Sequence, residues 1–395
     1  MLRASKVSSV RASSHRPTCA RVAPAFALAL PLLGACGPSA SAPAGDGGLT
    51  DSGPGVAIAP EASLTSDSSA RGTDASTLAS DSSAPAPEAA APRDPAQWPF
   101  ASSSPWNVPL ATTAQYEAAT DAETKTILST ASNSYVNRAS YSMPVFLAAS
   151  SDPLATLTYG SGYVNGNWAG KGTVSIHVPA SAAASGGTDS SIVIVTPDHL
   201  TGYESWQFAG TAPSFTTSYT VEQDLKGVGW GEGIHAAGCS LMGGLIRAWE
   251  LEALEIPHAL AVGIATTQAR SPYVWPAVAE DSGAATSYTG TVPMGTLLAI
   301  DPAANIDTLA SSPQGKALAL ALQDYGAYVI DTAGTATGVG FVVDPEGTTE
   351  AQANALRGDV AALVAHLRVV TNNTQASPGG GGPSAPRRAP AAPPF

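Results

Sequence analysis

Short runs of apolar and β-branched residues, alternating with polar ones in the clearest case, predict many β-strands along the folded part of this chain. In the segment 172–179, Val174, Ile176 and Val178 point one way and the polar residues between them point the other way. Comparable segments, spaced by roughly 10–20 residues, predict further strands. They lie at 142–148, 155–159, 191–196, 203–208, 215–222, 258–265, 294–300, 327–331 and 338–344. Helical periodicity is confined to 113–130, 313–325, 350–369 and a short helix after Gly238. This pattern predicts a mainly β fold, an antiparallel β-sandwich or jelly-roll-like domain with a few peripheral helices.

Composition divides the chain into four parts. Residues 36–95 and 373–395 consist largely of Ala, Ser, Pro and Gly, which cannot bury enough apolar surface to offset the entropy of ordering. We therefore expect a disordered tether over 36–95, one globular domain over 96–372 and a disordered tail over 373–395. Residues 1–35 carry a basic segment and then a 12-residue apolar run, 22–33, which is too short to span a bilayer.

The apolar run ends in Leu33-Gly34-Ala35-Cys36. This resembles the lipobox of bacterial lipoproteins, which are cleaved before the cysteine and acylated on its thiol. The resemblance implies that residues 1–35 are a signal peptide and that acylated Cys36 anchors the protein in a lipid bilayer. It predicts a location at the outer membrane or cell surface. An ordinary secretory signal with an incidental cysteine is the alternative.

Charge narrows the class of ligand. Loss of residues 1–35 leaves 13 of the 18 basic residues against 31 acidic ones, a net charge of −18. Such a chain lacks the electrostatic footprint of a nucleic-acid-binding protein, so no nucleic-acid partner is expected. Few charges, with many Thr, Ser, Gly and aromatic residues, suit a neutral ligand rich in hydroxyl groups, such as an extracellular polysaccharide.

The folded part also resembles a family of exported bacterial proteins of unassigned activity. The similar motifs, in chain order, are Trp206-Gln207, Gly244–Arg247, His258–Leu260, Tyr273–Ala277 and Ala321–Asp331. The resemblance implies export and a β-rich domain, but it implies no reaction and no catalytic residue.

Candidate catalytic residues gather between 191 and 265. Glu204 lies on a predicted strand with Trp206 and Phe208 on the same face, and desolvation there would raise its pKa towards that of a general acid. The competing interpretation is a carboxylate at a wet sheet margin. His235 lies in a glycine-rich loop, where catalytic groups often occur, whereas His258 begins a strand as either a proton shuttle or a hydrogen-bonded residue at the core edge.

These residues predict a carbohydrate-active enzyme, either a glycoside hydrolase or a polysaccharide lyase. Hydrolysis needs a second carboxylate. The candidates are Asp198, Asp224 and Glu232, with Asp224 placed in the predicted site. A lyase would need a basic residue against a uronate, and the few available are Lys171, Lys226, Arg247 and Arg270, which favours hydrolysis. Predicted substrate-binding residues are Trp206, Gln207, Tyr273 and Trp275. The alternatives are a non-catalytic glycan-binding module and a structural surface lipoprotein.

Cofactor motifs are weak. Beyond Cys19 and Cys36 the chain has one cysteine, Cys239, so no disulfide is expected in the domain. Cys239 opens an apolar run, which favours burial over a nucleophilic role, and acyl transfer by Ser240 or Cys239 remains an alternative. We predict no cofactor and no catalytic metal. A structural calcium ion at Asp301, Asn305 and Asp307 competes with a plain turn.

Overall fold

The computed structural model describes residues 92–333, 338–382 and 387–395. Within these ranges strand residues outnumber helix residues, which confirms the prediction of a mainly β domain. The predicted signal peptide, Cys36 and the tether as far as residue 91 lie outside the described residues. None of the described helices is long and apolar enough to cross a lipid bilayer.

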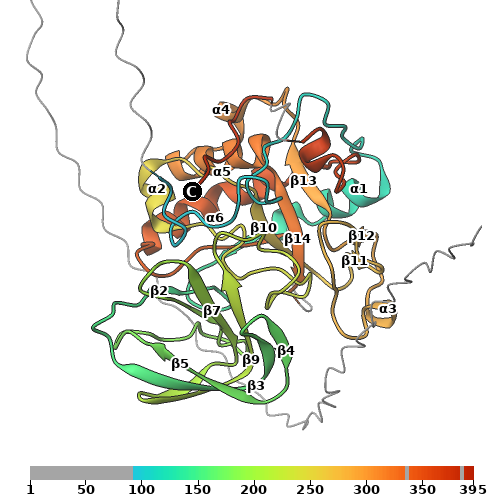
Figure 1. Cartoon of the computed structure of the whole chain (residues 1–395). Coiled ribbons are helices and arrows are strands. Elements are labelled where there is room, and N and C mark those ends of the chain that lie inside the picture. Colours follow the sequence, from blue (N-terminus) through green and yellow to red (C-terminus); the bar gives the residue numbers. More distant parts are fainter. Residues whose placement is uncertain (1–91, 334–337, 383–386) are drawn as a thin grey trace, which may run out of the picture. The chain divides into compact units, whose positions relative to one another are not determined.

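One sheet has six strands in the order β1-β15-β10-β14-β13-β16. Figure 1 labels β10, β14 and β13 of this sheet. These strands are β1 (Tyr135–Asn137), β10 (Leu260–Ile264), β13 (Leu297–Ile300), β14 (Ala327–Thr332), β15 (Gly340–Val342) and β16 (Leu367–Val369). The pairs β1–β15 and β10–β14 are parallel, while β10–β15, β13–β14 and β13–β16 are antiparallel. The sheet is therefore mixed.

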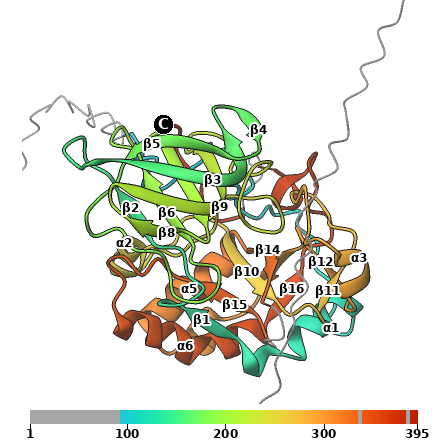
Figure 2. The same cartoon turned by 90° about the horizontal axis from the view of Figure 1, so that it is seen from below.

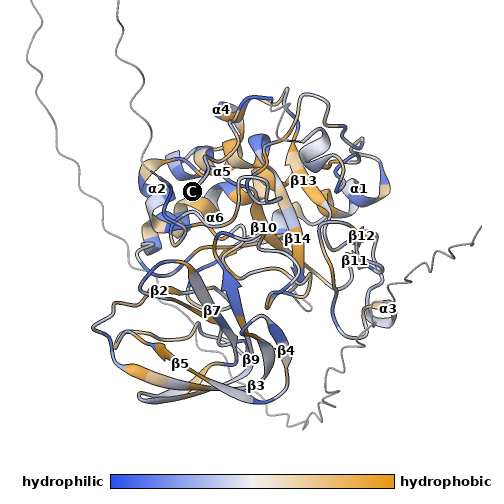
Figure 3. Ribbon diagram, in the orientation of Figure 1, coloured by the Kyte–Doolittle hydropathy of each residue, from blue (hydrophilic) through white to orange (hydrophobic). Residues whose placement is uncertain are grey.

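Both faces of this sheet are buried. Along β14, Val329 packs into a core with the helices, whereas Tyr328 packs into a second core on the opposite face, as the two-residue period of a strand requires. Leu298 and Leu297 of β13 divide between the two cores in the same way. In Figure 3, β13 and β14 accordingly carry largely hydrophobic colours.

The helices are short apart from two. They are α1 (Ala122–Leu128), α2 (Ala248–Ala253), α3 (Ala284–Ser287), α4 (Ile306–Leu309), α5 (Pro313–Asp324) and α6 (Glu350–Val364), with 3₁₀ helices η1 (Ala131–Asn133) and η2 (Pro378–Gly380). Leu318 and Leu322 of α5 and Leu356 and Leu363 of α6 belong to the core on the helical face of the six-stranded sheet. Figure 2 shows both helices along that face.

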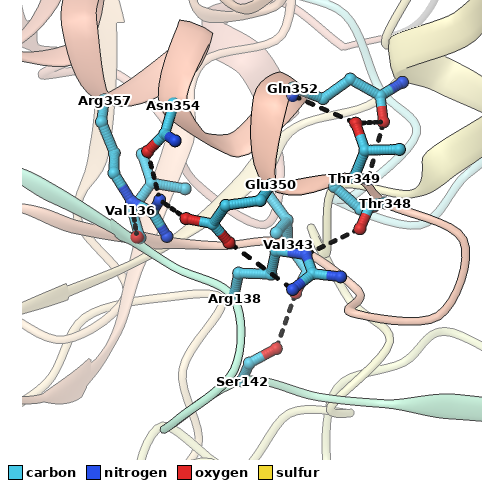
Figure 4. Close-up of polar contacts among 10 residues, drawn as sticks. All are labelled: Val136, Arg138, Ser142, Val343, Thr348, Thr349, Glu350, Gln352, Asn354 and Arg357. Carbon is cyan, nitrogen blue, oxygen red and sulfur yellow. Dashed lines mark hydrogen bonds and ion pairs between the residues drawn. The ribbon is translucent and has the colours of Figure 1, made fainter.

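A polar network holds α6 against β1 (Figure 4). Arg357 donates from Nε to the carbonyl of Val136 at 3.0 Å and pairs through Nη1 with Glu350 at 2.5 Å. Glu350 also pairs with Arg138 at 3.5 Å, and Thr349 caps the helix by accepting from the backbone N–H of Gln352. These contacts fix the start of α6 next to the sheet edge.

The second sheet has eight strands. Its main path is β2-β6-β7-β9-β3-β4, with β5 paired to β3 and β8 paired to β9. The strands are β2 (Val145–Leu147), β3 (Leu154–Val164), β4 (Asn167–Ala169), β5 (Gly172–His177), β6 (Ile192–Val195), β7 (Thr201–Trp206), β8 (Ala209–Thr211) and β9 (Ser214–Asp224). A separate two-stranded sheet joins β11 (Ala269–Arg270) to β12 (Val292–Pro293).

The eight-stranded sheet is also mixed, so the predicted purely antiparallel arrangement is wrong for both large sheets. β2 pairs with β6 and β3 with β9 in parallel, while its other pairs are antiparallel. Alternation along a strand reports which residues share a face, but it does not report the direction of a neighbour that is distant in sequence. A jelly-roll topology is not confirmed.

The central core connects the two sheets. It contains Val193 and Val195 of β6 together with Leu297 and Tyr328 of the six-stranded sheet. Trp106, near the beginning of the domain, stacks on Trp230 with ring centroids 4.8 Å apart. A third core, which includes Ile192, Ile194, Phe208 and Phe215, covers the other face of the eight-stranded sheet.

Two predicted helices are shorter than expected. The segment 113–130 is helical only in α1, and the segment 350–369 ends as strand β16 after α6. Leu367 and Ile300 are partners in the β16–β13 pair, so hydrogen bonding at the sheet edge replaces the last helical turn.

The C-terminal residues differ from the predicted disordered tail. In the described part of this segment, the Arg387 backbone donates to the carbonyl of Leu110 at 2.9 Å, and Tyr325 Oη donates to the carbonyl of Pro390 at 3.1 Å. The ring of Phe395 lies 4.0 Å from the guanidinium carbon of Arg93. Composition missed these contacts because they depend on surfaces formed elsewhere in the chain.

Candidate functional site

Glu204 is a residue of β7, and its side chain is fully buried against the loop that follows Trp230. Its carboxylate accepts hydrogen bonds from the Ser240 hydroxyl and, at 3.0 Å, from the backbone N–H of Leu241. Burial raises the pKa of Glu204 to about 7, and these hydrogen bonds oppose the rise. The raised pKa agrees with the prediction, but the predicted opening to solvent is wrong, because none of the residue is exposed.

Local backbone geometry explains why one predicted neighbour of Glu204 differs. Trp206 shares its strand face, as expected, but Gln207 has a φ of 57° and interrupts the alternation. Phe208 consequently packs against Phe215 in the third core, with ring centroids 4.7 Å apart.

His235 is held by the end of β14. Its Nδ1 lies 3.0 Å from Oδ2 of Asp331, which also faces the N–H of Ala236 at 3.5 Å. The residue is only 5% exposed, and its Nε2 is buried without a hydrogen-bond partner among the described residues. His235 is therefore oriented by a carboxylate, as in acid–base dyads.

A β-bulge positions Asp331. Val262 of β10 pairs with Val329, while the next residue, Gly263, pairs with Asp331, so Ile330 has no partner on β10. The Ile330 carbonyl instead accepts the N–H of Ala237 at 2.9 Å, which ties the histidine loop to the strand. Bulges commonly re-aim side chains beside functional sites.

Asp281 joins Asp331 through Thr332. The Thr332 backbone donates to Asp331 Oδ1 and its hydroxyl donates to Asp281 Oδ2, each at 2.8 Å. Tyr288 Oη also donates to Asp281 Oδ2, at 2.5 Å. Burial and then the negative charge of Asp331 raise the pKa of Asp281, while the two hydroxyl donors lower it. We call Asp331, His235, Asp281, Thr332 and Tyr288 the Asp331 cluster.

The predicted aromatic segment packs against the same loop. Val278 donates its backbone N–H to Ala237 at 3.0 Å, and this segment leads directly into Glu280 and Asp281. Tyr273 is 41% exposed, Trp275 is partly buried, and the Asp331 side chain is 36% exposed. The carboxylate of Asp331 is therefore accessible to solvent.

His258 belongs to a different, internal network. Its Nε2 lies 2.7 Å from Glu250, and its Nδ1 lies 2.9 Å from the carbonyl oxygen of Ala259. Burial lowers the pKa of His258, but the neighbouring Glu250 carboxylate outweighs this effect and the net pKa is raised. Arg247 pairs with buried Asp344 at 3.0 Å close by.

The hollow beside His258 is too small for a sugar. It is lined by Trp98, Phe100, Trp106, Asn107, Arg247 and His258, among others, and has a volume of about 10 Å³. That is room for roughly one water molecule. His258 therefore does not share an open site with His235, contrary to the sequence prediction.

Other predicted site residues lie elsewhere on the eight-stranded sheet. Asp224 is exposed at the end of β9 and accepts the backbone N–H of Lys226 at 2.9 Å. Trp206 donates to Asp189 at 3.3 Å, and Gln207 accepts from Ser218 at 2.5 Å. The partners of these three side chains lie on or next to the eight-stranded sheet, away from the Asp331 cluster in sequence.

Cys239 is fully buried, and burial raises the pKa of its thiol well above the usual value, which disfavours the nucleophilic thiolate.

Among the described residues, no group of three or more His, Cys, Asp or Glu side chains is arranged to hold a metal ion. Of the predicted calcium ligands, Asn305 caps α4 and Asp307 pairs with Lys316 at 2.8 Å. Calcium binding there stays a prediction.

A larger hollow lies away from these residues. It has a volume of about 340 Å³ and lies between α2 and α5, with Leu254, Pro257, Leu320, Asp324 and Tyr325 in its lining. Asp324 is already paired with Arg387 and Arg388. This hollow contains none of the residues predicted to act in catalysis.

Neither a known protein family, nor a curated protein, nor a solved structure matches this chain. The chemistry of the site therefore has to be argued from its own residues.

The Asp331 cluster is the part of the described chain best suited to acid–base chemistry. It combines a carboxyl group whose pKa is raised by burial and by a neighbouring charge, Asp281, with a second carboxylate that orients a histidine, Asp331. Sequence analysis identified His235 but missed both aspartates. The sequence feature that could have indicated Asp331 is its position directly after the apolar run 327–330, at the end of a predicted strand.

Proposed function

We propose that this protein is an exported lipoprotein whose folded domain is a carbohydrate-active enzyme acting on an extracellular polysaccharide. Asp281 serves as the proton donor, and Asp331, hydrogen-bonded to His235, serves as the second carboxylate. The observation that carries the proposal is the raised pKa of Asp281 beside Asp331 at a solvent-accessible position. Enzymes that cleave glycosidic bonds commonly use two carboxyl groups in such contrasting environments.

Hydrolysis is favoured over elimination. A polysaccharide lyase needs a cation against the uronate group, but Arg247 is engaged by Asp344 and Arg270 pairs with Glu123 at 3.2 Å. The net charge of −18 after loss of residues 1–35, from 13 basic and 31 acidic residues, further disfavours an anionic polymer. The expected substrate is therefore a neutral polysaccharide.

The activity is tested with the chain lacking residues 1–35 and carrying Cys36→Ser. It is incubated with a panel of neutral and uronate-containing polysaccharides, and new reducing ends and unsaturated uronates are measured. We expect reducing ends from a neutral polymer, and a loss of roughly 10²–10⁴-fold in turnover for Asp281→Asn and for Asp331→Asn. Asp121→Asn, an exposed carboxylate near α1, is the matched control and should keep full activity. Unchanged turnover in both cluster variants would remove the Asp331 cluster from catalysis.

Anchoring is a separate part of the proposal. Cells expressing the full chain are labelled with a fatty-acid analogue and fractionated. The label should appear on the wild type in the membrane fraction and be absent from Cys36→Ser. Equal labelling of both proteins would contradict acylation of Cys36.

A non-catalytic glycan-binding module is the second candidate. Exposed Trp168, Trp206 and Tyr273, at 49%, 36% and 41%, favour this candidate as well. It predicts retention on a polysaccharide without any new reducing ends, which the same panel distinguishes.

A further inference from the structure

Four aromatic side chains form a row on one face of the eight-stranded sheet. Tyr163 of β3 is the cross-strand partner of Trp168 on β4, and Trp206 of β7 is the partner of Tyr219 on β9. Directly opposite residues share a sheet face. Trp168 joins the two pairs, because its ring lies 5.1 Å from that of Tyr163 and 6.3 Å from that of Tyr219. We call these four residues the aromatic row.

Small residues on β3 allow Trp168 to reach across that strand. Ser161 is the β3 partner of Tyr219, and it is flanked by Gly160 and Gly162. A Cβ atom at Gly162 would lie 2.0 Å from the carbonyl oxygen of Thr220, so β3 and β9 approach closely only with glycine there. The indole of Trp168 consequently lies nearly parallel to the ring of Tyr219, at 19°.

Two rings of the row are well exposed. Trp168 is 49% exposed and Trp206 is 36% exposed, whereas Trp106 is only 1% exposed. Trp206 donates from Nε1 to the carboxylate of Asp189 at 3.3 Å, so an acceptor lies at the edge of this ring. Flat, exposed rings suit a sugar ring, whose C–H faces are apolar.

Charge distinguishes a sugar from the other common partner of exposed aromatic rings. Single-stranded nucleic acids also stack on such rings, but they require a positively charged groove for the phosphates. This chain has a net charge of −13, and the carboxylate of Asp189 contacts Trp206. A neutral glycan is therefore the ligand that fits.

The aromatic row is also continuous with the strand that borders the histidine loop. Glu204 and Trp206 lie on the same face of β7, about 7 Å apart along the strand. Glu204 accepts the N–H of Leu241, in the loop that also carries His235. The row therefore shares strand β7 with a residue that is bonded to the loop contributing to the Asp331 cluster.

We propose that Tyr163, Trp168, Tyr219 and Trp206 form a platform that binds a neutral polysaccharide chain by stacking against its sugar rings. The choice of a glycan rests on the proposed function. The platform itself is a second contact area for the polymer, separate from the groups that act on the glycosidic bond. It should increase retention on long chains and contribute little to the turnover of short oligosaccharides.

The test uses the full chain and a panel of neutral polysaccharides in affinity electrophoresis and pull-down assays. Binding is measured for the wild type, Trp168→Ala, Trp206→Ala and Tyr141→Ala, an exposed tyrosine outside the row that serves as matched control. We expect the wild type and Tyr141→Ala to bind equally, and each tryptophan variant to lose roughly tenfold in affinity. Thermal unfolding checks that each variant is folded. If one tryptophan variant does not fold, the other still tests the proposal.

The outcomes separate this inference from the proposed activity. Unchanged binding by the folded tryptophan variants, or the absence of wild-type binding to every neutral polymer, overturns the platform even if Asp331→Asn abolishes turnover. Binding that depends on Trp168 without any turnover supports the platform and contradicts the enzyme. Equal loss of turnover on oligosaccharides and polymers in Trp168→Ala would also overturn the platform as a separate contact area.

Discussion

The buried carboxylate of Glu204 accepts the backbone N–H of Leu241 at 3.0 Å, across 37 residues of sequence. This contact fastens the middle of β7 to the loop that carries His235. It makes Glu204 a residue that positions this loop, because its carboxylate has no exposed surface through which to meet a substrate.

Stability should therefore depend on pH through Glu204. Its pKa is raised from 4.5 to about 7, so the folded state keeps a proton that the unfolded chain has lost. The resulting stability is fully present below pH 4.5 and is lost as the pH rises to about 7, by roughly 3 kcal/mol. Urea unfolding of Glu204→Gln between pH 4 and 8 should show a correspondingly smaller loss, and identical pH dependence in both proteins would contradict the assignment.

The proton donor can be tested by a change next to it. Burial and the charge of Asp331 raise the pKa of Asp281, whereas the Tyr288 hydroxyl lowers it. Tyr288→Phe removes that donor, so the pKa of Asp281 should rise further. In a profile of kcat/KM against pH, the basic limb should move to higher pH because the acid keeps its proton longer.

Thr332→Ser is the control for this shift, because it retains a hydroxyl donor to Asp281. Its profile should resemble that of the wild type. A Tyr288→Phe profile whose basic limb stays in place would exclude Asp281 as the group that titrates there.

The Arg247–Asp344 pair should be important for stability. Both side chains are nearly buried, at 11% and 3% exposed, and Nε lies 3.0 Å from the carboxylate. Arg247→Ala leaves Asp344 charged and without its cation, which should cost about 3–5 kcal/mol in the free energy of unfolding. Lys316→Ala breaks the exposed pair with Asp307 and should stay close to the wild type in the same chemical denaturation.

The C-terminal segment should contribute to stability rather than act as a free tail. Deleting 387–395 removes the contacts of Arg387 with Leu110 and of Pro390 with Tyr325, at roughly 1–3 kcal/mol together. Calorimetry should show a lower Tm for the deletion. Arg388→Ala, at a half-exposed pair with Asp324, should change the Tm much less, and an unchanged Tm in the deletion would show that the segment adds no stability.

Sequence patterns determined the parts of this protein that depend on neighbouring residues. Alternation located the strand around Val174, and an apolar run located the strand around Ile194. The two-residue period placed Glu204 and Trp206 on one face, because successive side chains of a strand point to opposite sides. Only the tertiary structure decided that both sheets are mixed and that His258 joins Glu250 rather than His235. It also brought Asp281 to Asp331 and Trp168 to Tyr219. Those relationships depend on strand order, a bulge at Ile330 and desolvation by distant segments, none of which leaves a local periodic signal in the chain.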